Sequence, residues 1–508
     1  MTRLRALLAA PLFLLPACAT VEDAALNAPP SRAVAIPQTQ DPYFADAAAA
    51  LAARAPQGRA RNVILFIGDG MGVSTVTAAR IYAGQRQGGD GESYDLAMDQ
   101  APHSAFSRTY SHDFQVADSA ATATAMTTGV KTNSGVLGVA SAARLGDCAA
   151  GQANSIPTLF ELAEAQGLST GIVSTARITH ATPAAAYAHA AHRDWENDAV
   201  AAAGGAGACH DIARQLIEWP AGDGFEIALG GGRANFLPNT IADPEAPQIM
   251  GQRRDGRDLT AEWTAKSGHA YIWNAQQFAA TDFSSDVRVL GLFSPSHMAY
   301  ELQRGADPAG EPSLAEMTRA AITRLSQDRE GYVLMIEAGR IDHAHHEGRA
   351  QLALADTVAM DEAIRTALAM TSREDTLIIA TADHSHTLTI AGYARRNNPI
   401  TGLSADEESP RPGALDGKPY TTLGYANGPG AVFAGEGPAA RERPDLSGVD
   451  TSDPAFRVQA LVPLASETHA GEDVPVYAWG PGAEAISGTI EQQLIFHAMA
   501  HALGFRFR

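Results

Sequence analysis

Three short apolar runs, each ending at a turn that carries an acidic residue, constrain the fold more than any other feature of the chain. The runs are 63–67 (VILFI), 332–336 (YVLMI) and 376–380 (TLIIA). A continuous apolar run of this length is typical of a strand that is buried on both faces of a parallel sheet. Helix-like stretches at 156–167 and 350–370 lie between the runs. Strands that alternate with helices predict an α/β fold with a doubly wound, mostly parallel central sheet flanked by helices.

Ligand-type side chains gather where these strands are expected to end. The residues at or just after the three runs are Asp69, Glu337 and Asp383. The stretch 337–348 (EAGRIDHAHHEG) continues one strand end into a predicted helix, which places Asp342 and His346 on one helix face. The crevice beyond the carboxyl ends of the strands is the usual ligand site of such a sheet. Carboxylate and imidazole together suit zinc and oxygen ligands suit magnesium, so the pattern predicts a metal site there.

Further histidines surround these residues. His384 directly follows an acidic strand end, and His469 lies alone in 466–473 (SETHAGED). A lone histidine is more often structural than a metal ligand. His469 is therefore a candidate metal ligand only because the other ligand-type residues occur in the same chain. The histidines at positions 343, 345 and 386 cannot all be ligands beside their neighbours, and we expect most of them to lie around the metals or to be incidental.

Composition limits the partners of the chain. Asp and Glu outnumber Lys and Arg by 57 to 37, which gives a formal net charge of -20 over 508 residues. Most of the surface would repel a nucleic-acid backbone, and we expect no nucleic-acid-binding surface. An anionic substrate must therefore be attracted locally. The length fits about three domains, or one large α/β domain with insertions.

The first 18 residues have the features of a secretory signal. Arg3 and Arg5 precede an apolar stretch and a small-residue exit, and such a segment is removed rather than spanning a membrane. Residues 15–18 (LPAC) resemble a bacterial lipobox, in which Cys18 becomes the lipidated first residue of the mature chain. We expect an exported protein, periplasmic or held at the outer membrane only through a lipid anchor. The alternative is cleavage nearby and a free periplasmic protein.

Beyond Cys18 the chain has two cysteines, Cys148 and Cys209. In an exported chain a pair of cysteines favours one disulfide bridge. Two unpaired buried thiols are the alternative.

Composition shifts divide the chain into four parts. Residues 1–18 are the signal with its lipobox-like end, and 19–60 are a tether, up to about position 42, followed by an N-terminal helix. Residues 61–388 and 467–508 form the α/β domain, and the segment 389–466, rich in Gly, Pro and charge, is an insertion.

The chain resembles alkaline phosphatases, and the vertebrate type more closely than the enteric bacterial type. The resemblance runs from Arg61 to Phe505 and rests on FIGDGMG, VADSAATATA, THATPAAAYAH, EAGRIDHAHHEG, TADHSH, NGPG and THAGEDV. It implies an enzyme that hydrolyses small-molecule phosphate monoesters through a phosphoserine intermediate. Ser119 would be the nucleophile, with Asp118 supporting the geometry. A helix that begins at Ser119 would direct its positive end toward a bound phosphate.

The resemblance also implies two zinc ions and one magnesium ion. Their ligands would be Asp342, His346 and His469 for one zinc ion; Asp69, Asp383 and His384 for the other; and Asp69, Glu337 and Thr182, with waters, for magnesium. Arg193 matches the arginine that holds two phosphate oxygens. His180 stands where some bacterial relatives have an aspartate that affects magnesium binding, and His343 would lie near the phosphate.

Two further family features have counterparts here. Glu245, Phe293 and Asp307 match positions of the vertebrate calcium site, but Ser294 stands where a carboxylate ligand is expected, so we expect no tight calcium binding. The Ala-rich helix near 44–55 resembles the N-terminal arm that embraces a second subunit, and the insertion resembles the family's crown. The resemblance therefore implies a homodimer.

Two other functions compete with this interpretation. A phosphodiesterase or sulfatase of the same superfamily is the first, but Ser119 together with Glu337 and Arg193 favours monoesters. The second is a non-catalytic phosphate- or metal-binding lipoprotein, against which the intact serine and the complete ligand set argue.

Overall fold

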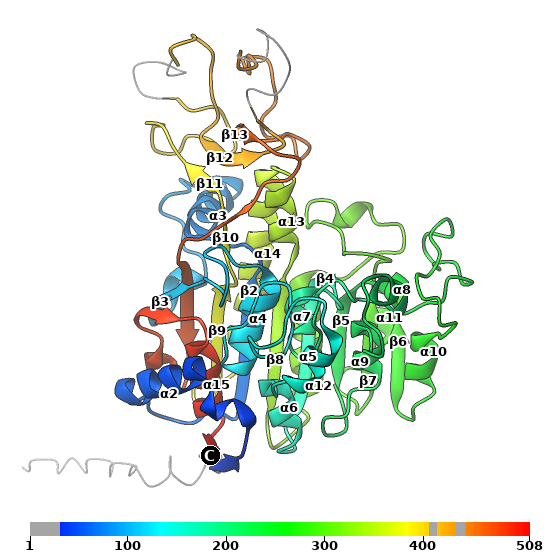
Figure 1. The fold of residues 1–508 in the computed structure, drawn as a ribbon. Helices are drawn as coiled ribbons and strands as arrows, with labels where there is room; N and C mark the ends of the chain where they lie inside the picture. The colour runs from blue at the N-terminus through cyan, green and yellow to red at the C-terminus, as the bar shows by residue number, and fades with distance from the viewer. Residues whose placement is uncertain (1–30, 406–413, 432–441) are drawn as a thin grey trace, which may run out of the picture.

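The computed structural model describes residues 31–405, 414–431 and 442–508, and a ten-stranded sheet lies at its centre (Figure 1). In spatial order the strands are β16 (Gly488–Glu491), β3 (His103–Arg108), β15 (Val474–Trp479), β9 (Thr376–Ala382), β2 (Asn62–Gly68), β8 (Tyr332–Ala338), β4 (Ser169–Arg177), β5 (Ile227–Gly231), β7 (Arg288–Leu292) and β6 (His269–Ile272). Strand β15 is antiparallel to both of its neighbours, and every other pair is parallel. The predicted signal segment, with Cys18, lies outside the described residues.

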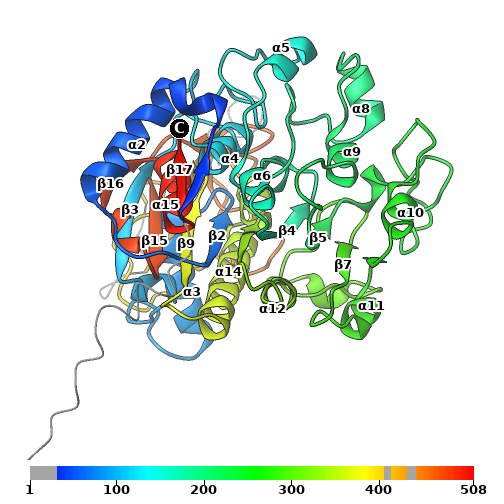
Figure 2. The same cartoon turned by 90° about the horizontal axis from the view of Figure 1, so that it is seen from below.

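Helices cover both faces of the sheet, as a doubly wound fold requires. Along β2 the side chains alternate between two hydrophobic cores: Val63 and Leu65 belong to one, and Ile64 and Phe66 to the other. Figure 2 shows α2 (Pro42–Arg54), α4 (Ser119–Thr128), α6 (Leu159–Glu164) and α15 (Leu494–Ala502) on one side, and α3 (Val73–Arg86), α12 (Leu314–Leu325) and α14 (Ala350–Met370) on the other. Within the described part of the chain, no helix has both the length and the apolar character needed to cross a membrane.

The three apolar runs are the central strands β2, β8 and β9, and every residue of these strands is buried. The predicted helix at 350–370 is α14. The stretch 156–167 forms the shorter helix α6, because Thr158 caps it: its side chain accepts from the backbone of Glu161, whose carboxylate accepts in return. This reciprocal capping box sets the start of a helix. The predicted α/β fold is confirmed.

The tether prediction is wrong for the residues just before α2. Strand β1 (Arg32–Val34) pairs in parallel with the C-terminal strand β17 (Phe505–Phe507). Gln38 is buried and donates from Nε2 to the carbonyl of Pro157 at 2.9 Å. These are largely main-chain contacts with distant segments, and such contacts leave no hydrophobic period in the local sequence. The predicted N-terminal helix is α2, which packs on α15.

The insertion contributes a small sheet of β11 (Leu388–Ile390), β12 (Leu423–Gly428) and β13 (Ala460–Pro463), at the top of Figure 1. Residues of this sheet share a hydrophobic core with α3 and the first turns of α14. Next to it, β10 (Ser385–His386) pairs with β14 (His469–Ala470), which brings the segment after β9 beside the segment after the insertion. The boundaries 389 and 466 themselves stay a prediction.

Cys148 and Cys209 are bonded to each other, 61 positions apart in sequence. Cys148 begins α5 (Cys148–Ala153), and both half-cystines pack against a small core around Trp195. The predicted disulfide is confirmed, and the alternative of two unpaired thiols is excluded in this structure.

Candidate active site

Helix α4 begins at Ser119, as predicted, and aims its first turn at the carboxyl ends of the central strands. The side chain of Asp118 caps the helix by accepting from the backbone N–H of Ala121 at 3.3 Å. All residues of α4 are buried, and most are Ala or Thr, so the helix fits close beneath the site. The hydroxyl of Ser119 lies 3.1 Å from His384 Nε2 and 3.4 Å from Asp69 Oδ1.

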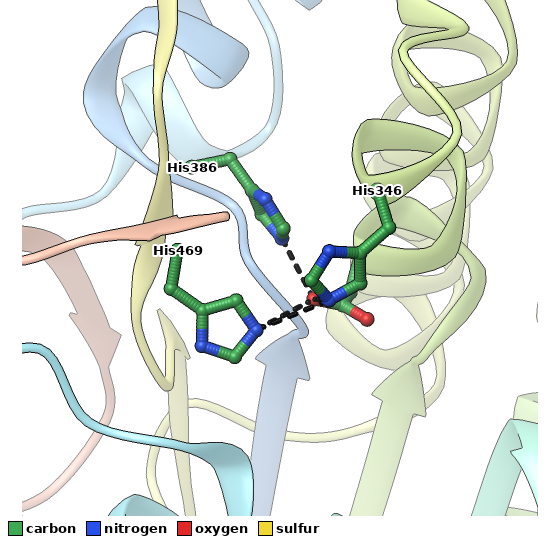
Figure 3. Close-up of side chains that lie close together, drawn as sticks. His346, His386 and His469 are labelled. Atoms are coloured by element: carbon green, nitrogen blue, oxygen red, sulfur yellow. Dashed lines mark hydrogen bonds and ion pairs between the residues drawn. The ribbon is translucent and has the colours of Figure 1, made fainter. Parts of the chain in front are cut away.

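The first ligand group surrounds Asp342, on helix α13 (Arg340–His346). Its Oδ1 lies 3.3 Å from His346 Nε2 and 3.4 Å from His469 Nε2. Figure 3 shows the imidazole rings of His346, His386 and His469 converging from α13, β10 and β14.

The imidazoles of His346 and His469 are held in orientations that suit metal binding. His346 donates from Nδ1 to the carbonyl of Glu467 at 2.6 Å, and His469 donates from Nδ1 to the carbonyl of Ala117 at 2.9 Å. These bonds leave the Nε2 lone pairs of both rings facing each other at 3.2 Å. A cation between them removes that repulsion, and a backbone acceptor on the far nitrogen is the usual support of a metal-bound histidine.

The second ligand group lies beside Ser119. Asp383 Oδ1 accepts from the backbone N–H groups of Gly70 and His384, both at 2.9 Å. This fixes its other oxygen, Oδ2, at 3.3 Å from His384 Nε2, and Asp69 Oδ1 lies 3.4 Å from the same nitrogen. The structure thus brings Asp69, Asp383 and His384 together next to the serine.

The third group is formed by Asp69, Glu337 and His180, with Thr182 on α7 (Ala181–Ala184) beside them. Glu337 Oε2 accepts from the hydroxyl of Ser174. Four buried oxygen atoms of these groups have no hydrogen-bond partner among the described residues: Asp69 Oδ2, Thr182 Oγ1, Glu337 Oε1 and Asp383 Oδ2. A buried unsatisfied polar atom costs about 1–3 kcal/mol, so the donor set fits bound cations.

Carboxylates crowd this centre and perturb one another. Burial, reinforced by the charges of Asp342, Asp383 and Glu337, raises the pKa of Asp69 well above its ordinary value. Burial also raises the pKa of Glu337 to about 8. For Asp342 burial acts in the same direction, but the hydrogen bond from His386 and the charges of neighbouring imidazoles hold its pKa well below the ordinary value. Divalent cations would reverse the repulsion and make the cleft attractive to an anion.

Arg193 lies at the edge of the third group and is held by Asp118. Its Nη1 donates to Asp118 Oδ2 at 3.0 Å, and its Nη2 donates to His180 Nε2 at 3.2 Å. Asp118 Oδ1 also accepts from the backbone of Gly135 at 3.0 Å. Asp118 therefore fixes both the start of α4 and the direction of the guanidinium group.

Sequence reasoning missed the importance of His386 and Glu467. His386 Nε2 donates to Asp342 Oδ1 at 2.7 Å, and its Nδ1 donates to Glu467 Oε2. Burial opposes protonation, but these two carboxylates raise the pKa of His386 to about 10. The spacing of His384 and His386, two residues apart on an extended segment, was the available signal. No sequence signal pointed to Glu467 except that it lies two positions before His469.

The remaining histidines of the cluster have other roles. The ring of His343 packs at a tilt against those of His297 and His180, with ring centroids 4.0 Å and 5.4 Å apart. His297, which receives a hydrogen bond from the backbone N–H of Arg177 at 3.2 Å, carried no signal in the sequence. His345 is buried between the hydroxyl groups of Thr75 and Tyr425, at 3.1 and 2.7 Å.

The positions matched to a calcium site lie together around Arg233. Glu245 Oε2 accepts from Arg233 Nη2 at 2.9 Å. Burial, with a hydrogen bond to Glu245, raises the pKa of Asp307 to about 7. Glu311, which carried no signal in the sequence, is buried near both carboxylates. The main-chain carbonyl of Ser294 accepts from the backbone of Gly232 and Arg233. That the chain does not bind calcium tightly stays a prediction.

A buried serine at the start of a helix, an arginine beside it and clustered carboxylates and imidazoles define a metal-dependent hydrolase. The alkaline phosphatase family model matches residues 60–505. The chain is 45% identical to an alkaline phosphatase of Gadus morhua over 88% of this chain and 92% of that protein. It is 44% identical to the tissue-nonspecific isozyme of Gallus gallus over 88% of this chain and 85% of that protein.

The solved structures agree with the sequence comparisons. The crystal structure of Thermus thermophilus alkaline phosphatase is similar with a TM-score of 0.64 and 26% identity, and the match covers 93% of this chain and 96% of that one. The chain therefore belongs to the alkaline phosphatase family and is a phosphoric monoester hydrolase. Its identity to the vertebrate proteins confirms the resemblance to the vertebrate type.

Proposed function

We propose that the chain hydrolyses phosphate monoesters to an alcohol and inorganic phosphate through a phosphoserine at Ser119, in a site with two zinc ions and one magnesium ion. One observation carries the proposal: the Ser119 hydroxyl lies within 3.4 Å of both His384 Nε2 and Asp69 Oδ1, at the start of a buried helix. The proposed ligands of one zinc ion are Asp342, His346 and His469. Those of the other zinc ion are Asp69, Asp383 and His384, and those of the magnesium ion are Asp69, Glu337 and Thr182.

The bound cations would lower the charge on the serine oxygen and on the departing alcohol oxygen by acting as Lewis acids. Ser119 Oγ forms a bond to phosphorus while the bond to the ester oxygen breaks, and the alcohol leaves. Arg193 donates to phosphoryl oxygens, a role suited to its planar fork, and Asp118 keeps it aimed. Water then cleaves the phosphoserine, which releases inorganic phosphate and restores the hydroxyl group of Ser119.

The catalytic contacts described above bind the phosphoryl group and not the alcohol group. We therefore expect many monoesters to be hydrolysed. The competing activities are tested by comparing p-nitrophenyl phosphate, bis-p-nitrophenyl phosphate and p-nitrophenyl sulfate. A monoesterase turns over the first much faster than the other two. A diesterase or sulfatase reverses this order, and a binding lipoprotein hydrolyses none of them at pH 9 with zinc present.

The decisive variant is Ser119→Ala. We expect it to lose nearly all turnover of p-nitrophenyl phosphate while it keeps its metals, measured by mass spectrometry of the native protein. Treatment of the wild type with EDTA is expected to abolish activity, and zinc together with magnesium is expected to restore it. Wild-type turnover in Ser119→Ala would refute the assignment of the nucleophile.

We also propose export, lipidation at Cys18 and a homodimer in which α2 and the crown-like insertion contact the second subunit. The exposed side chains of Leu461 and Val462 on β13 support an interface at the insertion. Mass spectrometry of the mature N-terminus tests lipidation, because simple cleavage leaves an unmodified residue. Sedimentation analysis tests the dimer, and a monomer at micromolar concentration would contradict it.

A further inference from the structure

A pocket of about 520 Å³ opens beside the Asp118–Arg193 pair. The segment before α4 and the loop 133–145 form its walls. Two large apolar side chains face it in exposed positions: Phe114 is 57% exposed and Leu145 is 55% exposed. Large apolar groups that stay this accessible next to a catalytic centre indicate a surface for a ligand.

The walls of the pocket are held in place by internal hydrogen bonds. Asp113 Oδ1 accepts from the hydroxyl of Ser111 and from the backbone of Ser134, both at 2.9 Å, which ties the Phe114 segment to the opposite loop. Asn133 Nδ2 donates to the carbonyls of Ser141 and Ala143, both at 2.8 Å, which fixes the loop that carries Leu145. The carboxylate of Asp113 is thereby engaged within the walls, and the pocket is formed before any ligand arrives.

Gly135 joins the pocket to the phosphate-binding arginine. Its N–H donates to Asp118 Oδ1 at 3.0 Å, and its carbonyl accepts from the backbone of Arg193 at 2.7 Å. Gly135 has φ +82, and a Cβ there would lie 2.8 Å from Leu145 Cδ1. A glycine is therefore required for Leu145 to close over this turn.

The segment before α4 reaches the other side of the centre as well. Ala117 accepts from His469 Nδ1 at 2.9 Å, so this segment contacts the first ligand group, while its neighbour Asp118 holds Arg193. In the proposed reaction the alcohol oxygen departs from the face of phosphorus opposite Ser119. A substituent on that oxygen would leave on the side of the first ligand group, which this segment contacts through Ala117.

We propose that this pocket binds the organic group of the substrate and favours monoesters of aromatic and other apolar alcohols over those of small alcohols. The inference rests on the proposed monoesterase function. Phe114 and Leu145 are the specificity-determining residues, and the benefit comes from apolar area removed from water. Cleavage of small monoesters needs only the phosphoryl contacts and is therefore retained.

The test compares 2-phenylethyl phosphate with ethyl phosphate, because both release an alkyl alcohol and differ mainly in apolar size. The metal-loaded full chain is assayed as wild type, as Phe114→Ser, as Leu145→Ser and as the double variant. We expect wild type to have a higher kcat/KM for the phenylethyl ester than for ethyl phosphate. In the double variant the ratio of these two kcat/KM values should be about tenfold lower. Turnover of ethyl phosphate and inhibition by inorganic phosphate should stay within about twofold, as expected when only binding of the alcohol group is lost.

Val200→Ser, on α8 (Asp198–Ala203), is the matched control, since Val200 is also an exposed apolar residue but lies outside the pocket. It should leave the preference unchanged. An unchanged preference in the double variant, or an equal loss for both esters, would overturn the inference while leaving the proposed function intact. Absence of turnover for both esters in wild type would overturn the proposed function and this inference together.

Discussion

Replacement of Glu467 should weaken the first zinc site although this residue is not among the proposed ligands. Glu467 is buried, with 1% of its surface exposed. Its Oε2 accepts from His386, and its Oε1 accepts from the backbone of Thr387 at 2.7 Å. His386 in turn donates to Asp342 Oδ1 at 2.7 Å. Glu467 therefore orients the group that orients a proposed ligand.

Glu467→Gln keeps the shape of this network and removes its charge. The amide can still accept from Thr387 and can donate to a neutral His386, so the fold is retained, but His386 no longer carries a stabilised positive charge beside Asp342. Loss of such a supporting partner lowers metal affinity about 10- to 100-fold, or about 1.4–2.7 kcal/mol. Glu467→Ala additionally leaves the partly buried N–H of Thr387 without its acceptor, which costs up to about 1–3 kcal/mol of folding free energy.

The assay is competition for zinc between the protein and a chromogenic chelator, with activity against free zinc concentration as a second readout. Glu374→Gln, at an exposed position in the turn before β9, is the control and should leave zinc affinity unchanged. A zinc affinity of Glu467→Gln within twofold of wild type would refute the idea that the Glu467–His386–Asp342 chain supports the metal.

Two further predictions concern stability. Closing a loop with a sequence separation of 61 contributes about 4 kcal/mol on the chain-entropy model, so the variant with both Cys148 and Cys209 changed to Ser should lose that much in urea unfolding; a loss below about 1 kcal/mol would contradict it. Burial lowers the pKa of His497 from 6.5 to about 4, so its contribution is complete above pH 6.5 and is lost, by about 3 kcal/mol in all, as the pH falls to about 4. Metal-free His497→Gln should therefore lose less stability than metal-free wild type between pH 7 and pH 4.5, and equal losses would count against this.

Much of the fold was predictable because its signals are local. The runs at 63–67 and 332–336 appear as β2 and β8, since a strand covered on both faces must be apolar throughout. The start of α4 at Ser119 follows from the capping side chain that precedes it. Strand β1 could not be found in this way, because Arg32–Val34 forms a strand only through pairing with the C-terminal residues.

In the candidate site, too, local sequence patterns predicted some contacts, and others depend on segments that are distant in sequence. Asp342 and His346 share a helix face, and their proximity could be predicted from a spacing of four residues. The pairing of β10 with β14, which sets His386 beside His469, depends on how the insertion returns to the domain. The short-range pattern predicted which residue types would meet at the strand ends, but not which nitrogen would face which oxygen.

By itself, the sequence determined the sheet, the strand ends that carry the acidic residues and the family to which the chain belongs, because these depend on apolar periodicity and on motifs of adjacent residues. Only the tertiary structure decided that Glu467 holds His386 against Asp342, that Asp118 aims Arg193, and that Phe114 and Leu145 flank one pocket. These contacts join segments from different loops, and their geometry is set by the packing of the whole domain, which no local stretch of sequence encodes.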